Sequence, residues 1–292
     1  MVALLGVAAA VHGLMLSRNE RATAPTPTQA SPNSVDPWKT TETAHYTIAS
    51  LASPEETART GKAIEQLHTA FLETFADLPA ARAPHRKLRV TLYATRGEFK
   101  AQNPFPAWAE ALYRAGECRA YVGGGPNPYH WMAHEATHQL SREVMGFQKA
   151  RWIDEGLAAY FGASRFEADG LHPGTLDTNA YPIWWLSQFR FTGSLEADAR
   201  DGRIIPLRAL IDDTGPPMAS HVNLYYIEYW SLTHFLLHFD NGRYTAGYKR
   251  LLQHGATAAD FEREIGPLWA VQAEWYAWLR KQQASVWATP SA

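Results

Sequence analysis

The segment HEATH, residues 134 to 138, places two histidines four positions apart and a glutamate directly after the first. Residues four apart lie on the same face of a helix, so His134 and His138 can bind one metal ion through both imidazoles. Glu135 is turned about 100° away from His134 around the helix axis. This offset suits a carboxylate that accepts a proton from an activated water and leaves the metal to the histidines.

A catalytic zinc site needs a third protein ligand and keeps its fourth position for water. The segment RWIDEGLAAYFGASRF, residues 151 to 166, follows a short connection through Gly146 and predicts a second helix. Glu155 is the candidate ligand on this helix. Asp154 competes with it, because the spacing alone excludes neither carboxylate.

Other histidines share the spacing of four residues but lack the following glutamate. His130 precedes His134, and we predict a role for it at the helix start or in supporting a ligand. His234 and His238 are predicted to make packing and polar contacts among the C-terminal helices. Cys118 is the single cysteine, so an intrachain disulfide and a cysteine-rich zinc cluster are both excluded, and any metal must use histidine and carboxylate ligands.

The elements that position these residues follow from their patterns. HYTIAS, residues 45 to 50, predicts a strand, and Ser53, Pro54 and Glu56 form the start signature of a helix. Residues 87–95 and 118–124 predict two more strands. Residues 129–144 contain no glycine or proline and carry apolar residues at helical spacings, which places HEATH on a helix. Beyond about residue 200 the pattern is mostly helical.

The N-terminal part of the chain differs in composition from the rest. Residues 1–17 begin with an apolar run of sixteen residues and predict a signal sequence or a short membrane anchor, hence an exported protein, periplasmic or extracellular. Residues 18–37 are rich in Pro, Thr and Ser and predict a disordered linker. The 292 residues include 27 Lys plus Arg and 29 Asp plus Glu, a balance that gives no electrostatic reason to expect nucleic acid as a partner.

HExxH followed by W-x-x-E-G-x-A-x-Y resembles the gluzincin zinc metallopeptidases, and most closely the peptidase MA-like group. The second motif reads Trp152, Glu155, Gly156, Ala158 and Tyr160 in this chain. The resemblance covers roughly residues 40 to 280 and is strongest around the motifs. It implies a bound Zn²⁺, with Glu155 rather than Asp154 as the third ligand beside the two histidines.

The same resemblance implies an α+β fold of the thermolysin-like zincin type within residues 38–287. An N-terminal α/β lobe of about residues 38–145 would hold a mixed sheet with an edge strand, and residues 146–287 would form a mainly helical lobe. Residues 118–124 are similar in place to the edge strand on which such enzymes lay an extended peptide. Tyr226, with Tyr225 as the alternative, matches the tyrosine that hydrogen-bonds the oxyanion in the transition state.

Two positions depart from the family pattern. The G-x-M-E-N element by which related aminopeptidases hold a substrate N-terminus is absent, which favours an endopeptidase. The position four after the third ligand is an Asp in the thermolysin-like pattern, where it orients a zinc histidine, and is Ala159 here. The sequence names no other residue for that task.

These observations together predict an exported zinc-dependent peptidase that acts on a peptide or protein substrate. The sequence does not assign its oligomeric state. One alternative is a catalytically silent binding module of the cell envelope, and another is a zinc hydrolase of a non-peptide amide such as a cell-wall crosslink. Glu135 argues against the binding module, which has no chemical need for it. The aromatic surface of such a module, which we predict instead as core or cleft wall, would comprise Tyr181, Trp184, Trp185, Phe189 and Phe191.

Overall fold

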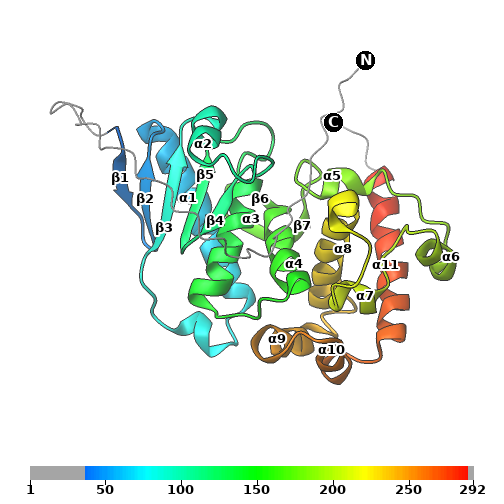
Figure 1. Cartoon of the computed structure of the whole chain (residues 1–292). Coiled ribbons are helices and arrows are strands. Elements are labelled where there is room, and N and C mark those ends of the chain that lie inside the picture. Colours follow the sequence, from blue (N-terminus) through cyan, green and yellow to red (C-terminus); the bar gives the residue numbers. More distant parts are fainter. Residues whose placement is uncertain (1–36, 289–292) are drawn as a thin grey trace, which may run out of the picture.

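The structure is a computed structural model that describes residues 37–288, and these residues form an α+β fold with a mixed sheet and many helices (Figure 1). The predicted fold class is confirmed at this level. The strands are β1 (Lys39–Glu42), β2 (Tyr46–Ser50), β3 (Leu88–Tyr93), β4 (Leu112–Arg114), β5 (Glu117–Tyr121), β6 (Ser164–Phe166) and β7 (Leu171–Leu176). The helices are α1 (Pro54–Thr74), α2 (Arg96–Gln102), α3 (His130–Gln139), α4 (Arg151–Gly162), α5 (Ile183–Leu186), α6 (Leu195–Arg200), α7 (Leu207–Ile211), α8 (Met218–His238), α9 (Thr245–His254), α10 (Ala258–Glu264) and α11 (Leu268–Ala288), with a 3-10 turn η1 (Pro79–Arg82) and a π-helical turn η2 (Leu140–Val144).

The predicted signal or anchor at residues 1–17, and all of the predicted linker at 18–37 except its last residue, lie outside the described residues. Within residues 37–288, no helix combines the length and the apolar character needed to cross a membrane.

The main sheet has the strand order β1-β2-β3-β5-β4. The central strands β2, β3 and β5 are parallel, whereas β1 and β4 are antiparallel to their neighbours. The predicted edge strand at residues 118–124 is therefore wrong, because β5 lies inside the sheet and β4 forms the edge. β4 joins β5 through a two-residue turn at Ala115 and Gly116, whose φ angles of 52° and 76° both lie in the left-handed region that such hairpins require.

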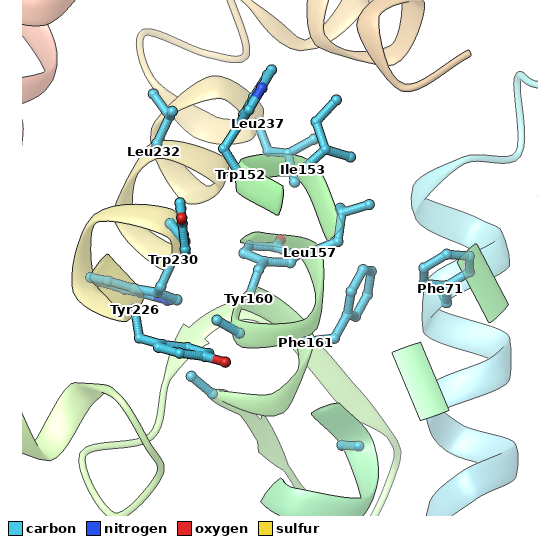
Figure 2. Close-up of a cluster of buried hydrophobic side chains, with 14 of the residues drawn as sticks. Phe71, Trp152, Ile153, Leu157, Tyr160, Phe161, Tyr226, Trp230, Leu232 and Leu237 are labelled. Carbon is cyan, nitrogen blue, oxygen red and sulfur yellow. The ribbon is translucent and has the colours of Figure 1, made fainter. Parts of the chain in front are cut away.

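Helix α1 begins where the sequence places its cap. The Ser53 hydroxyl accepts a hydrogen bond from the Glu56 backbone N–H at 3.2 Å, and the Glu56 carboxylate accepts one from the Ser53 N–H at 3.1 Å. The apolar face of α1 then packs toward α4, where the rings of Phe71 and Phe161 lie 5.1 Å apart (Figure 2). This contact fixes α4 beside the sheet.

Helix α4 packs against α3 on one side and against α8 on the other. Figure 2 shows Trp152, Leu157 and Tyr160 of α4 beside the α8 side chains. Gly156 permits the close approach, because a Cβ atom there would lie 2.4 Å from the Thr233 hydroxyl and 3.1 Å from the Tyr229 carbonyl. The predicted boundary between two lobes at residues 145 and 146 stays a prediction, since α4 contacts elements of both parts.

The second predicted helix is shorter than expected. It ends at Gly162, and Ser164–Phe166 form β6, which pairs with β7 instead of continuing the helix. The Ser164 hydroxyl donates to the Tyr160 carbonyl at 2.7 Å and accepts from the Gly174 N–H at 3.2 Å, so it joins the helix end to the hairpin. The helical pattern predicted beyond residue 200 is confirmed by α7 through α11.

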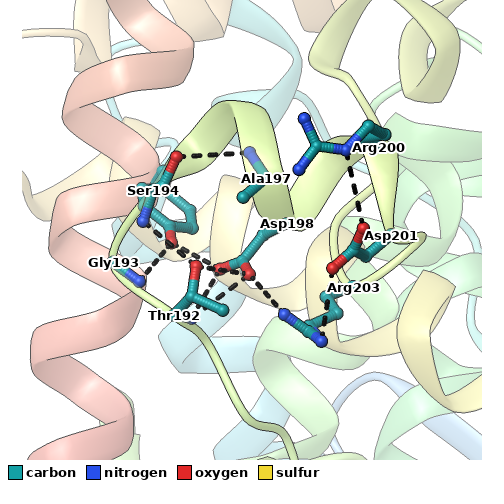
Figure 3. Close-up of polar contacts among 9 residues, drawn as sticks. Thr192, Gly193, Ser194, Ala197, Asp198, Arg200, Asp201 and Arg203 are labelled. Atoms are coloured by element: carbon teal, nitrogen blue, oxygen red, sulfur yellow. Dashed lines mark hydrogen bonds and ion pairs between the residues drawn. The ribbon is translucent and has the colours of Figure 1, made fainter.

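A buried aspartate anchors the loop that precedes α6 (Figure 3). The carboxylate of Asp198 accepts hydrogen bonds from the backbone and hydroxyl of Thr192, at 2.9 and 2.8 Å, and pairs with Arg203 at 3.2 Å. It also accepts a hydrogen bond of 2.5 Å from the hydroxyl of Tyr276 on α11. The loop after the aromatic segment 181–191 is thereby tied to the C-terminal helix.

Candidate metal centre

His134 and His138 lie one turn apart on α3 and are both almost fully buried. Their rings are nearly perpendicular, at 83°, with centroids 5.0 Å apart. Because α3 is held between α4 and the strands β4 and β5, the two imidazoles are fixed on one helix face, as the spacing predicts.

Glu155 on α4 completes a cluster of three donor atoms. Its Oε2 lies 3.4 Å from His134 Nε2 and 3.8 Å from His138 Nε2. Ligand atoms about 2.1 Å from a tetrahedral zinc ion are themselves separated by about 3.4 Å, so these distances fit zinc. Glu155 Oε2 is buried and has no hydrogen-bond partner among the described residues. A buried carboxylate oxygen in that state is a candidate metal ligand, and the two imidazole nitrogens beside it are candidate partners.

The groups around Glu155 determine the pKa of its carboxyl group. Burial alone would raise the pKa of its carboxyl group, but the contact with His134, the positive charge of His138 and the hydroxyl of Tyr226 lower it to about 2. The carboxylate is therefore ionised at neutral pH, as a zinc ligand must be.

Asp154, the competing carboxylate, points to the other nitrogen of His138. Its Oδ1 lies 2.9 Å from His138 Nδ1, and its Oδ2 pairs with Arg142. Burial lowers the pKa of His138, but the charge and hydrogen bond of Asp154, together with Glu155, raise it to about 9. Asp154 thus orients His138 so that Nε2 faces Glu155, a task for which the sequence names no residue after Ala159 replaces the expected aspartate.

Glu135 lies beside the donor cluster and is held by the edge strand. One of its donor atoms lies within 4.8 Å of a donor atom of each histidine. Its Oε2 accepts a hydrogen bond of 2.7 Å from the backbone N–H of Tyr113 in β4. Burial raises the pKa of Glu135, which favours proton uptake by this carboxylate. The sequence does not predict this contact, because β4 has only three residues and Ala-Gly is not among the usual two-residue hairpin turns.

Tyr226 on α8 faces the cluster, with its ring centroid 6.0 Å from that of His134. Burial raises the pKa of Tyr226 well above its usual value, so its hydroxyl stays protonated and can donate. The hydroxyl of Tyr225 donates to the Pro216 carbonyl at 2.7 Å and is engaged elsewhere. Of the two tyrosines, the structure brings only Tyr226 to the cluster of donor atoms.

Aromatic side chains form one wall near the cluster. Tyr181 lies 5.2 Å from Tyr226 and stacks on Trp131 at 5.5 Å, measured between ring centroids. Trp184, which is 37% exposed, packs edge-on against Trp131 and forms the outer part of this wall. Trp185, Phe189 and Phe191 instead pack against the hydrophobic core. The predicted core role is confirmed for part of the aromatic segment, and the predicted cleft wall stays a prediction.

The remaining histidines lie outside the cluster of donors. His130 is the first residue of α3, and its Nδ1 lies 2.8 Å from the Asn127 carbonyl, which agrees with the predicted place at the helix start. His234 Nε2 lies 3.0 Å from the Gly174 carbonyl, and His238 Nε2 lies 2.6 Å from the Tyr160 hydroxyl. The polar contacts predicted for this pair are confirmed.

Part of the chain matches a known protein family. Residues 130–254 match a family described as "Protein of unknown function (DUF1570)". The matched segment runs from the first residue of α3 to the last of α9 and includes the three donor residues, Glu135 and Tyr226. No curated protein matches the chain.

Proposed function

We propose that this protein is a zinc-dependent peptidase in which His134, His138 and Glu155 bind the metal. The observation that carries the proposal is the position of Glu155 Oε2, buried without a hydrogen-bond partner and within 3.8 Å of Nε2 of both histidines. Two imidazoles and a carboxylate are a ligand set typical of catalytic zinc, which leaves one position open. Zinc held there supplies a Lewis acid that polarises a carbonyl and lowers the pKa of water.

Glu135 is the general base in this proposal. Its carboxylate lies next to the donor cluster and is held by the Tyr113 N–H, so it can accept the proton of the attacking water and pass it to the leaving amine. Tyr226 donates its hydroxyl hydrogen to the oxyanion that develops on the carbonyl oxygen. Trp131 and Tyr181 stack on one another beside Tyr226 and border this side of the proposed site.

The substrate in this proposal is an extended peptide paired with β4. The Tyr113 N–H points to Glu135 on α3, while β5 occupies the other side of the strand. The Tyr113 N–H is thus engaged by Glu135, and a substrate strand added to this edge of the sheet would pair with the remaining open backbone groups of β4, beside Glu135. The lack of the element that holds a substrate N-terminus favours internal cleavage.

A gluzincin-like fold is part of the same proposal. It is supported by the two motifs, by their position on the adjacent helices α3 and α4, and by a mixed sheet that ends in an antiparallel edge strand. Export to the periplasm or the extracellular space, with or without an anchor, is proposed from the sequence of residues 1–17 alone.

A peptide-library digest followed by mass spectrometry tests the activity. Zinc-loaded wild type is expected to cut peptides internally, and Glu135→Gln is expected to keep zinc while activity falls by about 10² to 10⁴-fold. Glu167→Gln, a change of an exposed glutamate, is the matched control and should cut like the wild type. Equal cleavage by the Glu135→Gln variant would overturn the assignment of the base. Zinc binding without cleavage of any peptide would refute the peptidase and favour a non-peptide amide or a binding role.

A further inference from the structure

A second group of metal-ligating side chains lies on elements that carry no residue of the first centre. His45 directly precedes β2, Glu65 and His68 lie on α1, and His85 lies in the connection before β3. His45, Glu65 and His68 each offer a donor atom within 4.8 Å of the other two. His85 Nε2 lies 3.0 Å from His68 Nε2. Four residues that are distant in sequence are therefore gathered in one place.

The hydrogen bonds of this group leave ring nitrogens available to a metal. His45 Nδ1 lies 2.6 Å from Glu65 Oε2, so its N–H is donated to a carboxylate and Nε2 keeps its lone pair. His85 Nδ1 lies 2.9 Å from the Arg86 carbonyl, which likewise holds the hydrogen on Nδ1 and leaves Nε2 unprotonated. Since His85 Nε2 is an acceptor facing His68 Nε2, the two nitrogens share either one proton or one cation.

The surroundings favour a cation at this place. Glu65 brings a carboxylate, which accepts hydrogen bonds from the Thr43 hydroxyl at 2.5 Å and from the His45 backbone N–H at 2.7 Å. The nearby basic side chains are neutralised by other carboxylates, because Arg86 pairs with Glu143 at 2.9 Å and Lys87 pairs with Glu42 at 2.6 Å.

We propose that His45, Glu65, His68 and His85 form a second binding site for a divalent transition-metal ion, separate from the centre on α3 and α4. The Nε2 atoms of His68 and His85 are the two central ligands, and the carboxylate of Glu65 is the third. The ring of His45 stacks on that of His68, with centroids 3.9 Å apart, and its Nδ1 lies 2.6 Å from Glu65 Oε2, so His45 positions the carboxylate. Imidazole ligands with one carboxylate suit Zn²⁺, Ni²⁺ or Cu²⁺ rather than Mg²⁺ or Ca²⁺. A metal there joins α1, the start of β2 and the connection to β3, so it stabilises the sheet without taking part in catalysis.

Metal stoichiometry tests the proposal on the folded full chain. Metal-free protein is titrated with Zn²⁺ against a chromophoric chelator, and Co²⁺ absorption reports the ligand geometry. Wild type is expected to bind two equivalents, and His85→Ala and, separately, His45→Ala are expected to bind one. Both residues are partly exposed, so these variants are expected to fold, which circular dichroism checks. His172→Ala is the matched control, since this histidine lies in an exposed acidic group and pairs with Asp169.

The metal titration separates a failure of the second site from a failure of the proposed function. Glu155→Ala removes a ligand of the first centre and is expected to bind one equivalent, which His85→Ala then removes in the double variant. If the first centre binds no metal, the wild type binds one equivalent and the His85→Ala variant none, which supports the second site and refutes the peptidase. The second site is overturned if His85→Ala and His45→Ala bind as many equivalents as the wild type. It is also overturned if His172→Ala, rather than these two variants, loses the second equivalent.

Discussion

Replacing Asp154 with alanine removes the hydrogen bond that orients His138 but leaves all three proposed zinc ligands in place. The bond is 2.9 Å long and lies between two nearly buried side chains, with 9% and 11% exposure. A hydrogen bond to a charged group contributes about 1.5–3 kcal/mol. Since about 1.4 kcal/mol corresponds to a factor of ten, we expect zinc affinity to fall about 10 to 100-fold in Asp154→Ala.

The assay is a competition with a chromophoric chelator at pH 7, in which Glu155→Ala is measured in parallel. Asp154→Asn should lose less affinity than Asp154→Ala, because an amide oxygen can still accept the hydrogen of His138 Nδ1. Asp213→Asn is the matched control, since Asp213 also pairs with an arginine, Arg151, but on the surface. Unchanged affinity in Asp154→Ala would refute the orienting role. A loss as large as that of Glu155→Ala would make Asp154 a ligand.

Three further changes have expected outcomes. Tyr226→Phe should keep zinc and lower kcat by about 10² to 10³-fold, measured by peptide cleavage, and an unchanged kcat would exclude Tyr226 as the oxyanion donor. Gly156→Ala should destabilise the fold by about 1–3 kcal/mol in urea denaturation, because the added Cβ would lie 2.4 Å from the Thr233 hydroxyl. If the variant is as stable as the wild type, α8 moves away from α4 at no cost and the packing argument is wrong. The pKa of His138 is raised from 6.5 to about 9, so the stability that its protonation gives to the metal-free protein is fully present below pH 6.5 and is lost as pH rises toward about 9. Denaturation with chelator at pH 6.5 and 9.5 measures this loss, and greater stability at the higher pH would contradict it.

The parts of the site that depend on local geometry could be predicted from the sequence. His134, Glu135 and His138 follow from the helical repeat, which needs no knowledge of the rest of the chain. Glu155 follows from the family resemblance, whereas the roles of Glu155 and Asp154 are separated only by how α4 is rotated against α3. That rotation depends on packing at Gly156 and on the contact between Phe71 and Phe161, which lie far apart in sequence.

The order of the strands and the edge strand β4 likewise could not be predicted from local sequence patterns. β2, β3 and β5 have clear strand patterns, but their order depends on long-range pairing. β4 was missed because it has three residues and because Ala115 adopts a positive φ that is rare for a residue with a Cβ atom. The helix predicted to run to residue 166 ends early, because Ser164 hydrogen-bonds both the helix end and β7.

The order in which the centre assembles follows from where its parts lie in the chain. α3 and α4 are consecutive helices, so His134, His138 and Glu155 can meet once this hairpin has formed, whereas Tyr226 arrives only when α8 docks. In the proposed peptidase, local opening of α8 would therefore abolish turnover while the helix pair α3 and α4 retains the metal. Hydrogen exchange that is faster in α8 than in α3 would reveal such a state, a metal-loaded protein with the catalytic tyrosine withdrawn. For the proposed peptidase, zinc content alone would thus be an incomplete measure of the active fraction of a preparation.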